Sequence, residues 1–137
     1  MARNIIGVVI GLAVWMAAAL IIGSVMRSSW ADYASVAEAM AFTLPMMFAR
    51  LAIGVFATLL MGFVTACITP SKIARVIPGV VLLVFFIPEH VTLWDKFPIW
   101  YHAWFLLTLV PLTYLGNLIA SSTLGHRAAR QSIAAAS

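Results

Sequence analysis

Four long apolar stretches constrain the fold of this chain more than any other feature of its sequence. Because an α-helix rises about 1.5 Å per residue, roughly 20 apolar residues are needed to cross a hydrocarbon core of about 30 Å. The chain is 64% hydrophobic and only 9% charged, whereas a soluble domain has about 25% charged residues. We therefore expect an all-α integral membrane protein with a single membrane domain over residues 1–137. The four expected transmembrane helices cover residues 5–26, 50–69, 73–94 and 99–124.

The first apolar stretch also has features of a secretory signal peptide, with Arg3 in front of it and a small-residue patch at residues 17–19. Its apolar length exceeds the roughly 7–15 residues of a signal-peptide core, so we favour a retained transmembrane helix. The connections are mostly short, which makes successive helices antiparallel neighbours in an up-down bundle of four transmembrane helices.

The charges of the connecting segments indicate how the expected bundle lies in the membrane. On one side every charged residue is basic, whereas on the other side acidic and basic residues are mixed. The positive-inside rule places the purely basic side in the cytoplasm, so we expect a bacterial cytoplasmic (inner) membrane protein with both termini in the cytoplasm. The basic side carries Arg3, Lys72, Arg75, Arg127 and Arg130, and the outer side carries Arg27, Asp32, Glu38, Glu89, Asp95 and Lys96.

The longest connection, residues 28–49, has a helical pattern of its own. Ser29 followed by Asp32 resembles the capping box that opens many helices. Apolar residues then recur at helical spacing, so we expect a short amphipathic helix at about residues 30–43 that lies in the outer interface. Pro45 would redirect the chain into the second transmembrane helix. The alternative is one continuous, kinked helix that extends the second transmembrane helix.

Small residues share faces on three of the expected transmembrane helices. In lipid, helices associate through close packing of small residues and through polar contacts. We expect these faces to pack helix against helix within one monomer, and a dedicated dimer contact is the alternative. The expected packing residues are Gly7, Gly11, Gly54, Thr58, Gly62, Thr65 and Gly116.

The third apolar stretch predicts a polar cluster in the outer leaflet. Its uninterrupted part, residues 76–88, is too short to cross the core, so Glu89 and His90 should lie inside the membrane, at a depth similar to Arg50 and His102. Ionisable groups at that depth are costly unless paired or hydrated, which makes them functional candidates. We expect Arg50 to pair with Glu89, with a histidine as titrating neighbour. The structural alternative is that Arg50 reaches the headgroups and Glu89 caps a helix end.

Aromatic residues gather on the expected outer side. Tryptophan and tyrosine favour membrane interfaces because the ring prefers apolar contact and the N–H or O–H prefers water, and this preference explains most of them. The cytoplasmic edge has almost none, so an outer partner, a lipid or an apolar ligand is the alternative explanation. The expected aromatic interface consists of Trp30, Trp94, Trp100, Tyr101 and Trp104.

The sequence contains no motif of a known catalytic, metal or cofactor site. H-E-x-x-H, C-x-x-C, G-x-S-x-G and Gly-rich phosphate loops do not occur, and the single Cys67 has no second thiol to pair with. We therefore expect no catalytic residue, no metal and no cofactor, and lean against an enzyme. The excess of basic residues is explained by membrane topology, so no nucleic-acid partner is expected.

Three functional classes fit such a chain. We expect an accessory or assembly subunit of a membrane complex, because the chain is small and offers packing faces on several helices. Its partners would be the lipid bilayer and another membrane protein or further copies of itself. The first alternative is a small homo-oligomeric transporter or channel with an outward-facing polar pocket. The second is a membrane enzyme that acts on a lipid or quinone.

Overall fold

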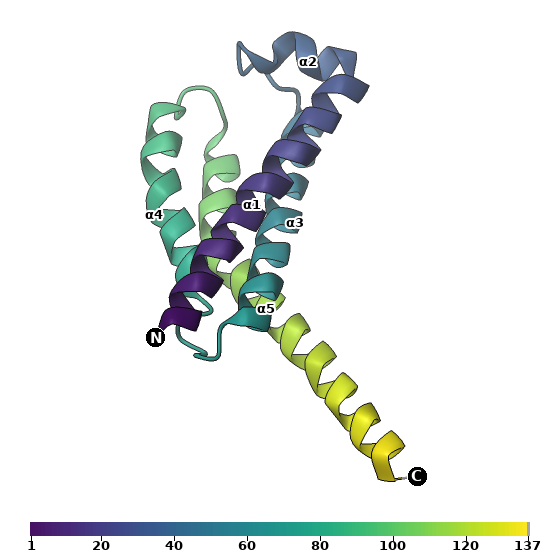
Figure 1. Ribbon diagram of the computed structural model, residues 1–137. Coiled ribbons are helices and arrows are strands. Elements are labelled where there is room, and N and C mark those ends of the chain that lie inside the picture. The colour runs from purple at the N-terminus through teal and green to yellow at the C-terminus, as the bar shows by residue number, and fades with distance from the viewer. Residues whose placement is uncertain (137) are drawn as a thin grey trace.

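The computed structural model describes the backbone of residues 1–136 and the side chains of residues 1–125. Within that part of the chain every regular element is a helix (Figure 1). The five helices are α1 (Ala2–Ser29), α2 (Ala31–Ala37), α3 (Leu44–Ile68), α4 (Ile77–Thr92) and α5 (Ile99–Ala136).

Three of these helices are long and apolar enough to cross a membrane: α1, α3 and the part of α5 from Ile99 to Gly125. Large apolar side chains such as Phe56 and Leu107 are exposed along them. A surface of this kind is unusual for a soluble monomer but is readily solvated by lipid. The all-helical membrane protein predicted from the composition is therefore confirmed.

The helix α4 is apolar but shorter than the third transmembrane helix that the sequence predicts. Its 16 residues rise about 24 Å, which is less than a hydrocarbon core of about 30 Å. It begins at Ile77 rather than at residue 73, because residues 72–76 form turns and Pro78 occupies the first turn of the helix. Proline is favoured there because its missing N–H has no partner in a first turn anyway.

The segment between α1 and α3 differs in length from the expected helix at residues 30–43. Helix α2 ends at Ala37, and residues 38–40 form a turn in which Met40 has a φ of 55°. This left-handed conformation is incompatible with a continuing α-helix. A new helix, α3, begins at Leu44 with Pro45 in its first turn, so α2 and α3 are separate helices rather than one kinked helix.

Helices α1 and α3 pack closely because glycine on α1 faces threonine on α3. A Cβ added at Gly7 would collide with the side chain of Thr69, and one added at Gly11 would collide with Thr65. Farther along α1 the small residues give way to Trp15, whose indole N–H donates to Thr58 Oγ1 at 3.0 Å. The two helices thus touch at one end and are held apart by an indole ring farther along.

The contact between α3 and α5 is closer still, because backbone meets backbone. A Cβ at Gly62 would collide with the carbonyl group of Thr113, and one at Gly116 would collide with the carbonyl oxygen of Leu59. Helix α4 also packs closely on α5, where a Cβ added at Gly79 would collide with the side chain of Thr113. A buried apolar cluster fills the centre of the bundle with Trp15, Ala57, Met61, Leu82 and Leu109.

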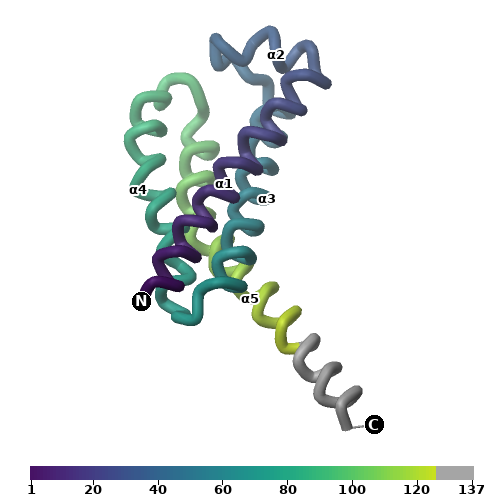
Figure 2. Tube along the Cα trace, viewed as in Figure 1, coloured from purple at the N-terminus to yellow at the C-terminus, as the bar shows by residue number. Residues whose placement is uncertain are grey.

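The bundle has two distinct ends. At the N-terminal end, the start of α1 lies beside the connection from α3 to α4 (Figure 2), where Ser71 N–H donates to Asn4 Oδ1. Arg75 is anchored there by donating to the carbonyl oxygen of Thr69 at 2.7 Å. At the opposite end, here named the α2 end, α2 crosses the top of the bundle and α1 and α4 diverge (Figure 1).

Candidate functional site

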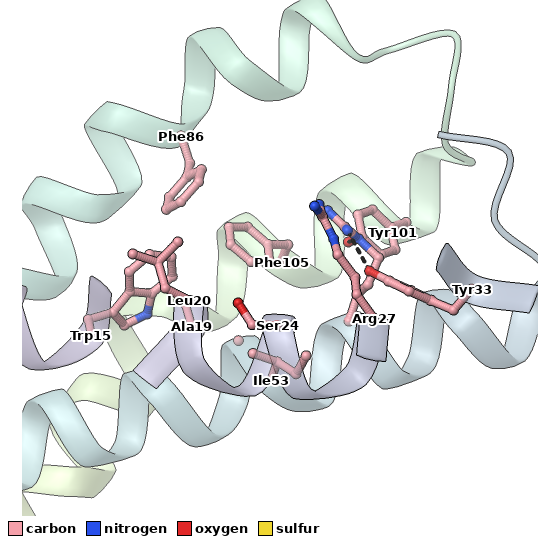
Figure 3. Close-up of a pocket in the computed structure, with 13 residues that line it drawn as sticks. Trp15, Ala19, Leu20, Ser24, Arg27, Tyr33, Ile53, Phe86, Tyr101 and Phe105 are labelled. Atoms are coloured by element: carbon pink, nitrogen blue, oxygen red, sulfur yellow. Dashed lines mark hydrogen bonds between the residues drawn. The ribbon is translucent and has the colours of Figure 1, made fainter. Parts of the chain in front are cut away.

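A pocket opens at the α2 end, where the helices diverge. Its volume is about 300 Å³, and residues from all five helices line it (Figure 3). Six of the lining residues come from α1, whereas α4 contributes only Phe86. The lining has a basic end and an aromatic end, and we name the whole cavity the arginine pocket.

The basic end of the pocket carries Arg27 from α1 and Arg50 from α3. Figure 3 shows the Arg27 side chain reaching from α1 toward Tyr101. Arg50 reaches the same tyrosine, because its Nε lies 3.4 Å from the Tyr101 hydroxyl. Two guanidinium groups therefore share one end of the cavity, and no carboxylate is among the residues that line it.

Arg50 is held in a fixed orientation by aromatic residues. Its Nη1 donates to the Tyr33 hydroxyl at 2.8 Å, and its guanidinium carbon lies 4.6 Å from the centroid of the Phe42 ring and 5.9 Å from that of Phe97. Such cation–π contacts are favourable, more so where water is excluded. A guanidinium has five N–H groups, and the two recorded hydrogen bonds, to Tyr33 and Tyr101, occupy only two of them.

The aromatic end of the pocket is apolar and rigid. Trp15, Phe86 and Phe105 line it, and their rings contact one another, with 5.3 Å between the centroids of Trp15 and Phe86 and 5.1 Å between those of Phe86 and Phe105. The hydrogen bond from Trp15 to Thr58 fixes the indole at the floor. The cavity thus offers positive charge at one end and apolar ring surface at the other.

Two histidines lie directly behind the aromatic wall. The Nδ1 atoms of His90 and His102 are 2.7 Å apart, so one imidazole donates a hydrogen bond to the other. His90 stacks against Phe105 with 4.9 Å between centroids, and Trp94 stacks on His102 at the same distance. His102 is only 2% exposed, and its Nε2 is buried without a hydrogen-bond partner.

The structure brings together some members of the expected polar cluster but not all of them. His90 and His102 are in direct contact, and Arg50 lies nearby through its bond to Tyr101. Glu89 is exposed. Among the side chains of residues 1–125 the partners of Arg50 are tyrosine hydroxyls, and no ion pair joins it to Glu89.

The residues of the expected aromatic interface occupy different environments. Tyr101 is buried beneath Arg50 and Trp94 covers His102, whereas Trp100 and Trp104 are 40% and 52% exposed. Trp100 and Trp104 line a second hollow, between α3 and α5, with a volume of about 490 Å³ and almost entirely apolar walls that include Phe48. We name it the α3–α5 groove.

Sequence reasoning missed several residues of the arginine pocket. Arg27 was assigned only to the outer connection, and Trp15, Tyr33 and Phe86 were not singled out for the site. The sequence could have shown that the two arginines lie at the same level, because Arg27 lies near the end of α1 and Arg50 near the start of α3. In antiparallel neighbours these positions fall at the same level.

Within the residues that the structure describes, no group of three or more His, Cys, Asp or Glu side chains is arranged to hold a metal ion. In comparisons with known proteins, no family model, no curated protein and no solved structure matches the chain.

Proposed function

We propose that this chain forms a bundle of four transmembrane helices in a bacterial inner membrane, with both termini in the cytoplasm. In this arrangement α4 spans the membrane together with α1, α3 and α5, and α2 lies in the outer interface. The connecting charges support the orientation, because the N-terminal end carries only basic residues such as Lys72 and Arg75. The arginine pocket then faces the outer leaflet.

We propose further that the function of the protein is to bind a small molecule in the arginine pocket. The observation that carries this proposal is the combination of two arginines at one end of an open cavity with an aromatic surface at the other. Ligand sites are concave, mostly apolar and equipped with a few convergent polar groups, and 300 Å³ is at the lower end of their usual volumes.

Binding from the outer leaflet fits either a transporter or a protein that handles a lipid, and it fits an open channel poorly. Below the pocket, the buried cluster around Met61 and Leu109 fills the centre of the bundle. A continuous water path would require this cluster to separate. The pocket lining contains no carboxylate and no histidine that could act as a general base for the Ser24 hydroxyl, so we propose recognition of the ligand rather than its chemical conversion.

Substitution of Gly23 tests this function. Gly23 lines the pocket, and a Cβ built there meets no atom within 4 Å, so Gly23→Leu should fill the cavity without disturbing the fold. Gly125→Leu is the matched control, because Gly125 is also a helical glycine with open space around it but lies outside the pocket.

The measurement is native mass spectrometry after purification in mild detergent and incubation with a lipid extract. We expect a bound non-protein mass on the wild type and on Gly125→Leu, and little or none on Gly23→Leu. Equal occupancy in all three proteins, or no bound mass on the wild type, would contradict the proposal.

The second candidate function is an accessory or assembly subunit of a membrane complex. The α3–α5 groove favours it, because Phe48, Trp100 and Trp104 present a hollow apolar surface toward the lipid. Aromatic residues of this kind are enriched at protein interfaces. Native mass spectrometry of the protein purified from its source cells tests this candidate, which requires a defined heteromeric mass. A homo-oligomer or a monomer would argue against it.

A further inference from the structure

The arginine pocket has a net positive charge that its own lining does not neutralise. Arg27 and Arg50 converge on one end, and the lining contains neither aspartate nor glutamate. Glu89 on α4 and Asp32, which precedes Tyr33 on α2, are both exposed, and neither forms an ion pair with Arg50 among the described side chains. An uncompensated charge inside the membrane is unfavourable, so an anion beside the partly buried Arg50 would relieve an unfavourable arrangement.

The donors at this end suit a tetrahedral or planar oxyanion. A guanidinium binds carboxylate or phosphate through parallel N–H···O bonds, and three N–H groups of Arg50 remain after its bonds to Tyr33 and Tyr101. Those bonds and the Phe42 ring fix the Arg50 guanidinium, so little side-chain entropy remains to be lost when a ligand binds. Arg27, on the opposite wall, is exposed and can close over the anion.

The rest of the cavity selects for an apolar body attached to the anion. Trp15, Phe86 and Phe105 form the wall away from the arginines. Inorganic phosphate would leave this surface covered by water or empty. The volume of about 300 Å³ holds a headgroup and the first part of an apolar chain. The remainder of the chain would leave beside Gly23, which lines the cavity and where an added Cβ would meet no atom within 4 Å.

We propose that the arginine pocket binds a phosphate monoester carried on an apolar chain, with the phosphate between Arg27 and Arg50 and the chain against Trp15, Phe86 and Phe105. Two guanidinium charges match a phosphate monoester, whose charge near pH 7 is about −1.5 to −2, better than a carboxylate or a phosphodiester with a single charge. This inference rests on the proposed function, because it names the ligand class of the same pocket.

The test is a titration of the detergent-solubilised protein with dioleoyl phosphatidic acid, followed by native mass spectrometry. Dioleoyl phosphatidylglycerol, dioleoyl phosphatidylcholine and inorganic phosphate are the comparison ligands. We expect phosphatidic acid to bind most tightly, phosphatidylglycerol less tightly, and phosphatidylcholine at least about 10-fold more weakly than phosphatidic acid. Inorganic phosphate should neither bind detectably nor compete at a concentration equal to that of the lipid.

Arg27→Gln is the informative variant, because Arg27 is exposed and its loss should not affect folding. We expect at least about a 10-fold weaker affinity for phosphatidic acid, as is typical when a charge-assisted hydrogen bond is removed. Arg3→Gln is the matched control: it removes an exposed arginine from the other end of α1 and should leave the affinity unchanged. Arg27→Lys should recover part of the affinity, since lysine keeps the positive charge but lacks the paired N–H groups of the guanidinium.

Several results would overturn the inference. Equal binding of phosphatidylcholine would show that the pocket does not recognise the headgroup charge. Competition by inorganic phosphate at equal concentration would show that the apolar chain does not contribute to binding. An unchanged affinity of Arg27→Gln for phosphatidic acid would show that the phosphate does not bind between the two arginines. In each of these cases, loss of lipid binding in Gly23→Leu would leave the proposed function intact. Unchanged binding in Gly23→Leu would contradict both proposals.

Discussion

The N-terminal end of the bundle and its α2 end are held together by different kinds of contact. At the N-terminal end, α1, α3 and α5 approach so closely that Gly7, Gly11 and Gly62 have no room for a Cβ. At the α2 end, the helices separate around aromatic rings and charged side chains such as Arg50. The first arrangement maximises the contact between helices, whereas the second leaves space for a ligand. Close packing of small residues stabilises helix pairs in lipid, so stability and binding should depend on different ends of the same helices.

The largest expected effect is at the closest contact, where Gly62→Leu should prevent or severely weaken folding. A Cβ there would collide with the carbonyl group of Thr113, and backbone atoms cannot rotate away as a side chain can. We expect a loss of about 3 kcal/mol or more, measured by thermal unfolding and by size-exclusion chromatography in dodecyl maltoside. Gly23→Leu, in open space at the α2 end, should keep the wild-type melting temperature. Similar losses in both variants would contradict the distinction between the two ends.

The boundary between the two ends lies at Trp15, and Thr58→Val tests it. This change keeps the shape of the side chain but removes the acceptor of the Trp15 indole N–H, which is buried. A buried donor without a partner costs about 1–2 kcal/mol, and a tilted indole would also weaken lipid binding. Thermal unfolding measures the first effect. In the control, Thr123→Val, the lost hydroxyl donates only to the carbonyl of Ile119 in its own helix, and stability should be nearly unchanged.

The histidine pair tests whether polar contacts stabilise the α2 end at all. His102→Phe keeps a ring that can stack on Trp94 but removes the hydrogen bond to His90. We expect a loss of about 1 kcal/mol in the free energy of unfolding, because one buried partner of a hydrogen bond is left alone. The double variant His90→Phe/His102→Phe should be more stable than the single one, since both polar groups are then gone. A double variant with the summed losses of both single variants would show that the pair is not coupled.

The smallest effect is expected for Glu89→Gln. Glu89 is exposed at the α2 end, and Arg50 donates to tyrosines instead, so neutralising this carboxylate should leave the melting temperature unchanged. A clear loss of stability would indicate an ion pair that forms in lipid. The same variant should bind phosphatidic acid at least as tightly as the wild type, because it removes a negative charge from the neighbourhood of the pocket.

The apolar stretches predicted the helices well, because an uninterrupted run of apolar residues can be satisfied in lipid only by a helix. Local turns were harder to predict. Helical spacing continued from Trp30 beyond Met40 in the sequence, yet Met40 adopts a left-handed conformation that ends the helix. That conformation depends on how α2 packs against its neighbours, and the spacing of apolar residues in the sequence gives no information about this packing.

The candidate site was predicted in part, because depth along a helix can be counted but direction across the bundle cannot. Counting residues placed Arg50, Glu89 and His102 in the outer third of the membrane, and the structure brings His102 into contact with His90, the neighbour of Glu89. The pairing of Arg50 with Glu89 rested on similar depth and opposite charge, neither of which fixes where a side chain points across the bundle. In the structure Arg50 donates a hydrogen bond to the hydroxyl of Tyr33. The position of Tyr33 depends on how α2 packs on the rest of the bundle.

Hydrogen exchange followed by mass spectrometry, with and without dioleoyl phosphatidic acid, tests the central claim most directly. If the α2 end is the binding end, the lipid should slow amide exchange in residues 24–33 and 46–54, which include Arg27 and Arg50, and leave the connection at residues 70–76 unchanged. Slowing of exchange at residues 70–76, or no change around either arginine, would contradict the account.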